Sequence, residues 1–458
     1  MNKLTSLFLI LSLLGAGSIA ATNITVNSLP ALQTAINKSV PGDTIILANG
    51  VYTSTDKILI EKQGTEKKPI VITAKAIGGV EINGTNGFVV SSPSAYVVIR
   101  GFKFTHASGK TTMGVGTNHC RITRNVFECT GTGAYLTNSG DDNQIDHNTF
   151  QNKSTEGQMI SVQGPGNNRM AQRTWIHHNY FYKFVSTANN CGSIQVGLSS
   201  RSMSTAYTLV EHNLFSQTRG ENENICNKSC RNTYRYNTFG DGVSELSLRH
   251  GNFCQVYGNF FLGSEGIRFF GHSHKIFCNY FERCSPAINI GNGDGVIPPD
   301  KLTMHDRPDS VQITFNTLVN NKVNVIMQAR NNGLGAYNIT FANNIIQGGS
   351  KAVDVKGEIK NPIWEGNIIW NTDGIGTIPE RGYTAIDPLL KKEANDKYHL
   401  LKGSPAIGKS AGNYPYVTED IDSQPRKAKY DIGADQYMAG NPTNHILTIA
   451  EVGPNSPE

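Results

Sequence analysis

The most constraining feature of this chain is a short phrase that recurs from Arg121 onward. It consists of an alternating, strand-like stretch, then an asparagine, then one residue of any kind and an apolar residue, as in RITRNVF and LVEHNLF. Its asparagines are Asn125, Asn148, Asn179, Asn213, Asn237, Asn259, Asn279, Asn316, Asn344 and Asn367. Their spacings of 23, 31, 34, 24, 22, 20, 37, 28 and 23 residues indicate a basal repeat of about 20 to 24 residues with variable insertions.

A repeat of this kind predicts an all-β fold, a single-domain right-handed parallel β-helix. One coil of short strands cannot bury its own apolar face, whereas stacked coils bury a continuous core. We expect Ile145, Ile176, Val210 and Val256 to point into that core, together with the apolar residue after each asparagine. The corner asparagines are expected to adopt left-handed backbone geometry and to bond their amides to the neighbouring coil. A leucine-rich horseshoe would need leucines at fixed positions, and a propeller blade would need roughly 40 or more residues.

The N-terminal residues predict export and a capped first coil. A basic start, the apolar run from Leu7 to Leu14 and small residues at Ser18 and Ala20 are typical of a secretory signal peptide cleaved near Ala20. The protein is therefore expected to be periplasmic or secreted. Residues 28–46 predict an amphipathic helix that covers the strand edges of the first coil.

The C-terminal residues predict an irregular end to the same domain. Residues 401–437 are interpreted as closing coils, so the β-helix domain spans residues 21–437. Residues 438–458 are rich in Pro, Asn and Gly and are expected to form a frayed tail.

Composition excludes several classes of protein. The 17 Tyr and 19 Phe with only 17% charged residues argue against disorder. The balance of 41 basic and 36 acidic residues, a net charge of +5, is too mild for a dedicated nucleic-acid binder, and after removal of the signal peptide no membrane partner is expected. The eight cysteines match no zinc pattern, so we expect mostly buried thiols with one or two disulfides at most.

Three oxygen-bearing side chains fall into register when they are counted from the corner asparagines. Asn189 lies ten residues after Asn179, and Glu223 lies ten residues after Asn213, so neighbouring coils should place them in one column. Glu221 precedes Glu223 by two residues, and strand alternation puts both carboxylates on the same face. Such a donor set predicts a metal site, and hard Ca²⁺ is the ion that prefers oxygen ligands.

A set of basic residues follows at one-coil spacing. Lys228, Arg249 and Arg268 are 21 and 19 residues apart and are expected to form one column on the face that carries the carboxylates. His250 and His272 accompany them. A solvated face of salt bridges would explain any single pair, but the whole set over adjacent coils favours a functional site.

The same residues resemble polysaccharide lyase family 6, which holds alginate lyases and the dermatan-cleaving chondroitinase B. The similarity rests on Lys228 in ENENICNKS, followed 21 residues later by Arg249 in LRHGN. It implies a right-handed β-helix in which Asn189, Glu221 and Glu223 bind calcium. It also implies that Lys228 is the catalytic base and Arg249 the catalytic acid.

One segment departs from the family pattern. The chain has NNCGSIQ at residues 189–195 where relatives tend to have NGGETIR. Gln195 thus replaces a residue that is often basic in alginate-cleaving members, which leaves the sugar preference at that position open.

The resemblance implies cleavage of an acidic polysaccharide, most simply alginate, by β-elimination to 4,5-unsaturated oligosaccharides. Abstraction of the weakly acidic C5 proton places negative charge on the uronate carboxylate, which Ca²⁺ would stabilise. Lys228 must be neutral to accept that proton, and nearby Ca²⁺ and Arg249 would favour its neutral form. Arg249 would protonate the departing O4 or polarise a water there.

The remaining candidates are substrate contacts. Arg268 has the planar fork that suits a carboxylate clamp, and His250, His272, His274 and Tyr135 are weaker candidates for sugar contacts. An alginate lyase of the poly(β-D-mannuronate) lyase type is the leading hypothesis. The alternatives are a lyase for dermatan sulfate, which would require more basic groups along its groove, and a non-catalytic β-helix that binds glycans.

Overall fold

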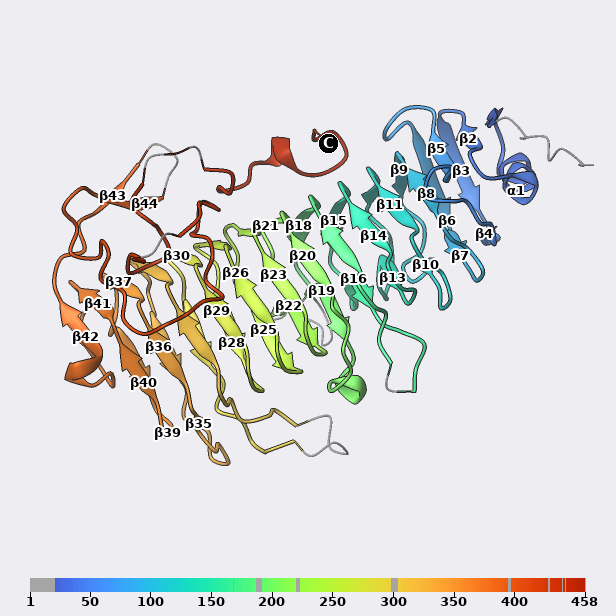
Figure 1. Ribbon diagram of the computed structural model, residues 1–458. Coiled ribbons are helices and arrows are strands. Elements are labelled where there is room, and N and C mark those ends of the chain that lie inside the picture. Colours follow the sequence, from blue (N-terminus) through green and yellow to red (C-terminus); the bar gives the residue numbers. More distant parts are fainter. Residues whose placement is uncertain are drawn as a thin grey trace, which may run out of the picture.

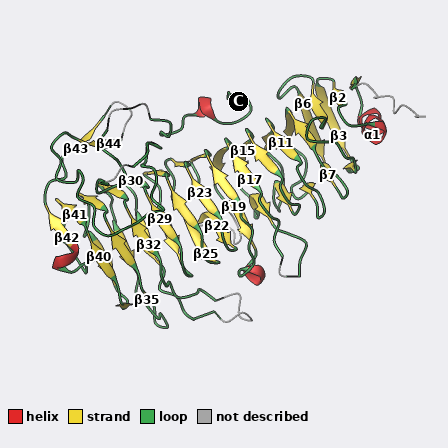
Figure 2. Ribbon diagram, in the orientation of Figure 1, coloured by secondary structure: helices red, strands yellow, loops and turns green. Residues whose placement is uncertain are grey.

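The computed structural model describes residues 21–167, 169–186, 192–219, 223–297, 304–393, 397–426, 429–438, 440 and 442–457. In these residues the chain forms a right-handed parallel β-helix, as the repeat predicted. Figure 1 shows the coils stacked into one elongated body, and Figure 2 shows that strands make up almost all of its regular structure. The predicted signal peptide, residues 1–20, lies outside the described residues.

Three long parallel sheets run the length of the stack, and each coil contributes one strand to each sheet. Sheet A contains β1 (Asn23–Val26), β2 (Thr44–Leu47), β5 (Ile70–Ala74), β8 (Val97–Arg100), β11 (Arg121–Thr123), β14 (Gln144–Asp146), β17 (Trp175–His177), β20 (Leu209–Glu211), β23 (Thr233–Arg235), β26 (Gln255–Tyr257), β29 (Lys275–Phe277), β32 (Gln312–Thr314), β36 (Thr340–Ala342) and β40 (Ile363–Glu365).

Sheet B lies next along the chain in each coil. It contains β3 (Gly50–Ser54), β6 (Val80–Gly84), β9 (Phe102–Phe104), β12 (Val126–Phe127), β15 (Thr149–Lys153), β18 (Tyr180–Phe184), β21 (Leu214–Ser216), β24 (Thr238–Phe239), β27 (Phe260–Leu262), β30 (Tyr280–Glu282), β33 (Thr317–Val319), β37 (Ile345–Gln347), β41 (Asn367–Trp370) and β42 (Tyr383–Ala385).

Sheet C carries the candidate site. It contains β4 (Ile58–Ile60), β7 (Phe88–Val90), β10 (Thr111–Met113), β13 (Leu136–Asn138), β16 (Gln158–Val162), β19 (Gly192–Gly197), β22 (Glu223–Lys228), β25 (Glu245–His250), β28 (Ile267–Phe269), β31 (Ile288–Ile290), β34 (Val325–Met327) and β38 (Val353–Val355). Two short pairs complete the described strands, β35 (Ala336–Tyr337) with β39 (Ile359–Lys360) and β43 (Leu390–Lys392) with β44 (Tyr398–Leu400).

The corner asparagines form a continuous buried ladder. The backbone N–H of each asparagine donates to the side-chain Oδ1 of the next at 2.9–3.2 Å, from Asn125 to Asn367. Each Nδ2 also donates to a strand carbonyl of the preceding coil, as Asn237 does to Val210 at 2.9 Å. The amide bonding was therefore predicted correctly, but the position of the left-handed residue was wrong. That conformation belongs to the residue before each asparagine, for example Tyr236 with φ +56°.

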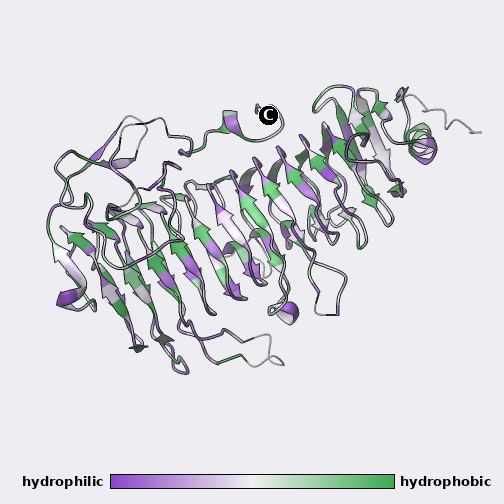
Figure 3. Cartoon of the chain, in the orientation of Figure 1, coloured by the Kyte–Doolittle hydropathy of each residue, from purple (hydrophilic) through white to green (hydrophobic). Residues whose placement is uncertain are grey.

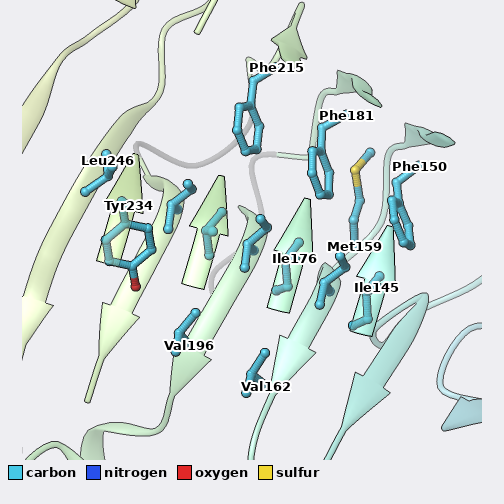
Figure 4. Close-up of a cluster of buried hydrophobic side chains, with 14 of the residues drawn as sticks. Ile145, Phe150, Met159, Val162, Ile176, Phe181, Val196, Phe215, Tyr234 and Leu246 are labelled. Carbon is cyan, nitrogen blue, oxygen red and sulfur yellow. The ribbon is translucent and has the colours of Figure 1, made fainter. Parts of the chain in front are cut away.

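Stacked phenylalanines fill the core beside this ladder. Figure 4 shows Phe150, Phe181 and Phe215 in a row, and their centroids lie 5.3 and 4.7 Å apart with nearly parallel rings. The predicted inward residues, Ile145 and Ile176 among them, are fully buried. The hydropathy colouring in Figure 3 changes along the strands because successive side chains alternate between core and surface.

The capping helix is present but shorter than predicted. Helix α1 spans Leu29–Lys38, and Ser28 caps it by accepting a hydrogen bond from the Ala31 N–H at 3.3 Å. The prediction of a helix to residue 46 was wrong, because Pro41 and Gly42 interrupt it and Thr44–Leu47 instead form β2. Within the described residues no helix is long and apolar enough to cross a membrane.

The C-terminal segment also differs from the prediction of a frayed tail. Figure 1 shows it running back over the coils towards β15. Leu447 and Val452 pack on Leu214, and Arg124 donates to the carbonyls of Pro454 and Ser456 at 2.8 Å. Apolar contacts and hydrogen bonds together anchor this segment.

The described cysteines are buried free thiols. They are Cys120, Cys129, Cys226, Cys230, Cys254, Cys278 and Cys284. No disulfide links these seven, so the expected majority of buried thiols is present, and the core rather than cross-linking holds this part of the coils together.

We predict that Asn237→Ala lowers the free energy of unfolding by about 3 kcal/mol or more. The substitution leaves several buried groups without partners, among them the Asn213 N–H, and each costs roughly 1–3 kcal/mol. Guanidinium denaturation measures the change. The control Asn23→Ala, at an exposed position of β1, should change stability by less than about 0.5 kcal/mol, and equal effects of both substitutions would contradict the ladder's role.

Candidate functional site

The candidate site lies on the outer face of sheet C, where five adjacent strands place side chains in register. One column runs across β19, β22, β25, β28 and β31 and consists of Gln195, Cys226, Ser247, Arg268 and Asn289. The residues that alternate with this column, such as Ile194 and Leu246, point into the core. The packed core therefore fixes the strands that present these outward side chains.

Lys228 ends β22 and is largely covered, with 9% of its surface exposed. Its Nζ donates to Gln195 Oε1 at 3.3 Å. Its partners in register are Gly197 and His250. A Cβ at Gly197, where φ is +101°, would lie 2.3 Å from the Lys228 carbonyl oxygen, so this close approach requires glycine.

Arg249 occupies an irregularity in the pairing of β22 with β25. Asn227 pairs with Leu248 but Lys228 pairs with His250, so Arg249 is the extra residue of a β-bulge. A bulge changes the direction of a side chain. Here the guanidinium Nη1 of Arg249 lies 3.1 Å from Glu223 Oε1, and a third of its side chain remains exposed.

Glu223 is the buried centre of this charge network. Its Oε1 accepts from Arg249 at 3.1 Å and from Arg268 Nη2 at 2.5 Å. Burial alone would raise the pKa of its carboxyl group, but Arg268 and Arg249 more than offset this and hold the pKa below its usual value. Glu223 is therefore an ionised carboxylate beneath the two arginines.

The prediction of a single basic column was wrong. Arg268 aligns with Ser247 and Cys226, two positions before the register of Lys228. The prediction of a shared face is confirmed, because the side chain of Arg268 reaches Glu223 and lies beside Arg249 on the same surface.

The fork of Arg268 is engaged by the protein. Besides Glu223, it contacts Glu245 Oε1 at 2.8 Å and Ser247 Oγ at 3.1 Å. A substrate carboxylate would have to compete with these acceptors, so the geometry assigns Arg268 a part in holding the two glutamates.

Two acidic residues of this face were missed in the sequence. Glu245 pairs in register with Glu223 and is buried, and Glu265 lines the cavity beside it. Burial raises the pKa of Glu245 to about 8 despite Arg268, with Glu265 and Glu223 adding to the rise, and burial raises that of Glu265 to about 7. The 22-residue spacing from Glu223 to Glu245, one coil, was the signal that could have identified Glu245.

His305 was also missed, because it arrives on the long insertion between Asn279 and Asn316. Its ring lies 5.5 Å from that of His250 and 4.6 Å from that of Phe270. Burial, with nearby Arg249 adding to the effect, lowers the pKa of both imidazoles, to about 4 for His305 and about 3 for His250. Two neutral imidazoles thus stand beside the arginine.

The other candidate residues lie apart from this cluster. Tyr135 is buried in the core, and its hydroxyl donates to the Gln151 carbonyl at 3.3 Å. His272 packs edge-on against Phe253, and His274 is fully buried against the Phe270 carbonyl. Tyr135 directly precedes β13 of sheet C, whereas His272 and His274 lie between β28 of sheet C and β29 of sheet A. Spacing alone does not show which of these side chains reach the site.

Of the predicted calcium ligands, Asn189 and Glu221 lie outside the described residues. Glu223 fits such an ion, since it is an ionised, buried carboxylate on the outer face, and Glu245 adds a second carboxyl group in register. Oxygen donors of this kind suit a hard cation. A cation bound there would share Glu223 with the two arginines.

The fold and this face together define a parallel β-helix with a groove lined by acids and bases. A protein-family model described as Chondroitinase B matches residues 26–343. The chain belongs to this family, which is polysaccharide lyase family 6.

Solved structures of similar fold agree with the family. The chain is 26% identical to AlyGC, a PL6 family alginate lyase, with a TM-score of 0.74 over 83% of this chain and 56% of that one. It is 25% identical to a mannuronic acid specific polysaccharide family 6 lyase from human gut microbiota, with a TM-score of 0.71 over 80% and 91%. A PL6 alginate lyase complexed with a trisaccharide is 18% identical, with a TM-score of 0.68 over 84% and 92%.

The chain spans little more than half the length of AlyGC. A comparison with curated protein sequences gives no match.

We predict that Glu245→Gln makes stability less dependent on pH. A carboxyl whose pKa rises from 4.5 to about 8 on folding keeps its proton in the folded state, so the wild type loses stability as pH rises through that interval. In the presence of a chelator, the Tm of the variant should therefore rise relative to the Tm of the wild type from about pH 5 to about pH 8. The control Glu66→Gln, at an exposed position, should show no such trend, and a pH-independent difference for Glu245→Gln would contradict the assignment.

Proposed function

We propose that the protein is an exported polysaccharide lyase that cleaves alginate by calcium-assisted β-elimination, with Lys228 as base and Arg249 as acid. The observation that carries the proposal is the convergence of Lys228, Arg249 and Glu223 on one face of adjacent strands. Membership of the family and the likeness to AlyGC and to the mannuronic acid specific lyase support alginate as the substrate.

Lys228 is suited to remove the C5 proton of a uronate. Its Nζ donates a hydrogen bond to Gln195 Oε1 at 3.3 Å, and this bond orients the amine. Its covered position limits its contact with water. Lys228 pairs with His250, so Arg249 lies on the adjacent strand.

Glu223, with Asn189 and Glu221, would hold the calcium ion. When bound, the ion would supply Lewis-acid stabilisation of the negative charge that develops on the substrate carboxylate. Glu223 also fixes Arg249 through the 3.1 Å contact, so the residue that binds the ion also positions the arginine.

Arg249 would act at the glycosidic oxygen that leaves C4. A third of its side chain is exposed, which allows contact with a sugar while Glu223 holds the buried part. An arginine remains protonated at neutral pH, so it stabilises the developing negative charge on O4 and the proton reaches O4 from the guanidinium or from a water that it polarises. The neutral rings of His250 and His305 form a wall beside it.

The second candidate is a dermatan sulfate lyase, which the family description favours. Arg249 and Arg268 of the described face are both paired with the ionised Glu223, so much of their positive charge is already balanced before a sulfated chain binds. Alginate, with one carboxylate per sugar, suits the mixed charges better.

The proposed activity is tested by incubating the protein with alginate, dermatan sulfate and polygalacturonate and following the ultraviolet absorbance of unsaturated uronates. Absorbance should rise with alginate. A rise with dermatan sulfate alone would support the second candidate, and no rise with any of the three would refute lyase activity.

We predict that Lys228→Ala lowers kcat by roughly 10²–10⁴-fold, the usual contribution of a positioned base. The fold should be retained, because Lys228 is not part of the hydrophobic core. Initial rates on alginate measure the effect, with Lys57→Ala, an exposed lysine before β4, as the control. Full activity of Lys228→Ala would show that another group takes the proton.

We predict that chelation abolishes activity and that added Ca²⁺ restores it. A ligand that binds only the folded state also raises the unfolding temperature, so Ca²⁺ should stabilise the wild type but not Glu223→Gln. Activity after exhaustive chelation is the first measurement and the calcium-dependent shift in Tm the second. Unchanged activity in chelator would contradict a role for calcium.

A further inference from the structure

The groove on sheet C continues beyond the candidate site towards the C-terminal coils. A cavity of about 500 Å³ begins at Glu245 and Arg268, the residues that contact or adjoin Glu223. A second cavity of about 590 Å³ extends it as far as Asp373. The two share the lining residues Val323, Ile326, Gln328 and Ala329, so they form one continuous trough.

We infer that this trough is a distal binding site for the same acidic polysaccharide, which holds several sugars beyond the point of cleavage. The inference rests on the proposed function for its ligand class, a polyuronate. From β25 to β38 the trough crosses four strand spacings of about 4.8 Å each, or about 19 Å, which is longer than one pyranose ring. A site of this length favours internal cleavage of a long chain.

The floor of the second cavity suits a sugar ring. Val323, Ile326 and Ala329 line it, and Ile326 points outward because its neighbours in β34, Val325 and Met327, are fully buried. A pyranose presents an apolar C–H face and a polar rim. Small aliphatic side chains on a flat sheet can therefore cover the C–H face and leave the hydroxyl and carboxylate groups at the edges.

The rim of the second cavity carries groups that match those edges. Lys351 and Lys356 are exposed and can donate to uronate carboxylates, whereas Asp354 and Asp373 can accept from hydroxyls. Lys356 Nζ lies 2.8 Å from Asp354 Oδ1, and both side chains are partly exposed, so the pair can open towards a ligand at little cost. Asp354 is paired in register with Ile326, which places the rim directly beside the apolar floor.

These four charged residues follow the part of the chain that the family match covers. The match ends at residue 343, and Lys351, Asp354, Lys356 and Asp373 lie beyond it. The charged rim of the second cavity is therefore built by residues outside the matched family region, whereas its apolar floor lies within that region. Glu223, Lys228 and Arg249 also lie within it. A distal site can thus change the preference for chain length without altering the reacting groups.

The double variant Lys351→Ala/Lys356→Ala tests the inference. We expect kcat/KM on polymeric alginate to fall about tenfold, mainly through KM, because contacts remote from the reacting sugar contribute to binding. On the shortest alginate oligosaccharide that the wild type cleaves, kcat/KM should not change. The matched control is Lys57→Ala/Lys62→Ala, which removes the same charge near the N-terminal end and should leave both rates unchanged.

The outcomes separate this inference from the proposed function. Suppose that the wild type cleaves alginate. If kcat/KM of the double variant then falls equally on the polymer and on the short oligosaccharide, or falls on neither, the distal site is refuted and the lyase activity stands. If the wild type cleaves no uronate, calorimetric titration with alginate decides: weaker binding by the double variant supports the site, and equal binding refutes it.

The apolar floor has a separate test that distinguishes a sugar from a second copy of the chain. Ile326→Asp should weaken binding of polymeric alginate while sedimentation velocity gives the same mass as for the wild type. A wild-type dimer that Ile326→Asp dissociates would instead identify the trough as a subunit interface and overturn the inference.

Discussion

The buried asparagine ladder is the interaction on which the rest of the structure depends. Each rung joins two coils through the backbone N–H and the side-chain amide, from Asn125 to Asn367. The spacing of the coils and the register of all three sheets follow from it, because an asparagine displaced by one residue would lose these bonds inside the core. Insertions such as the one that lengthens the spacing from Asn279 to Asn316 to 37 residues are tolerated, because the chain returns to the corner position before the next asparagine bonds.

The candidate site uses this regularity and departs from it where β22 pairs with β25. The regular register brings Glu223, Glu245 and Arg268 together from strands that are distant in sequence. The bulge at Arg249 then turns one arginine out of the pattern and towards Glu223. A rigid scaffold with local irregularities in one strand pair is a simple way to hold charged groups at short distances.

Much of the fold and part of the site could be predicted from the sequence. The recurring asparagine predicted the coils, and one-coil spacing predicted that Lys228, Arg249 and Arg268 share a face. The spacing between repeats could not predict the bulge. The repeat length itself varies from about 20 to 24 residues, so one extra residue in a strand cannot be recognised from it. It also could not predict His305, which reaches the site on an insertion, or the packing of the C-terminal segment, which depends on contacts with Leu214 and Arg124 that are far away in sequence.

The central claim is that this face performs elimination, and the fate of solvent oxygen tests it most directly. Alginate oligosaccharides are cleaved in water labelled with heavy oxygen, and the products are weighed by mass spectrometry. The account predicts that no label enters either fragment and that one fragment carries a double bond, since a proton leaves C5 and no water is added. Incorporation of the label with saturated products would show hydrolysis and contradict the account.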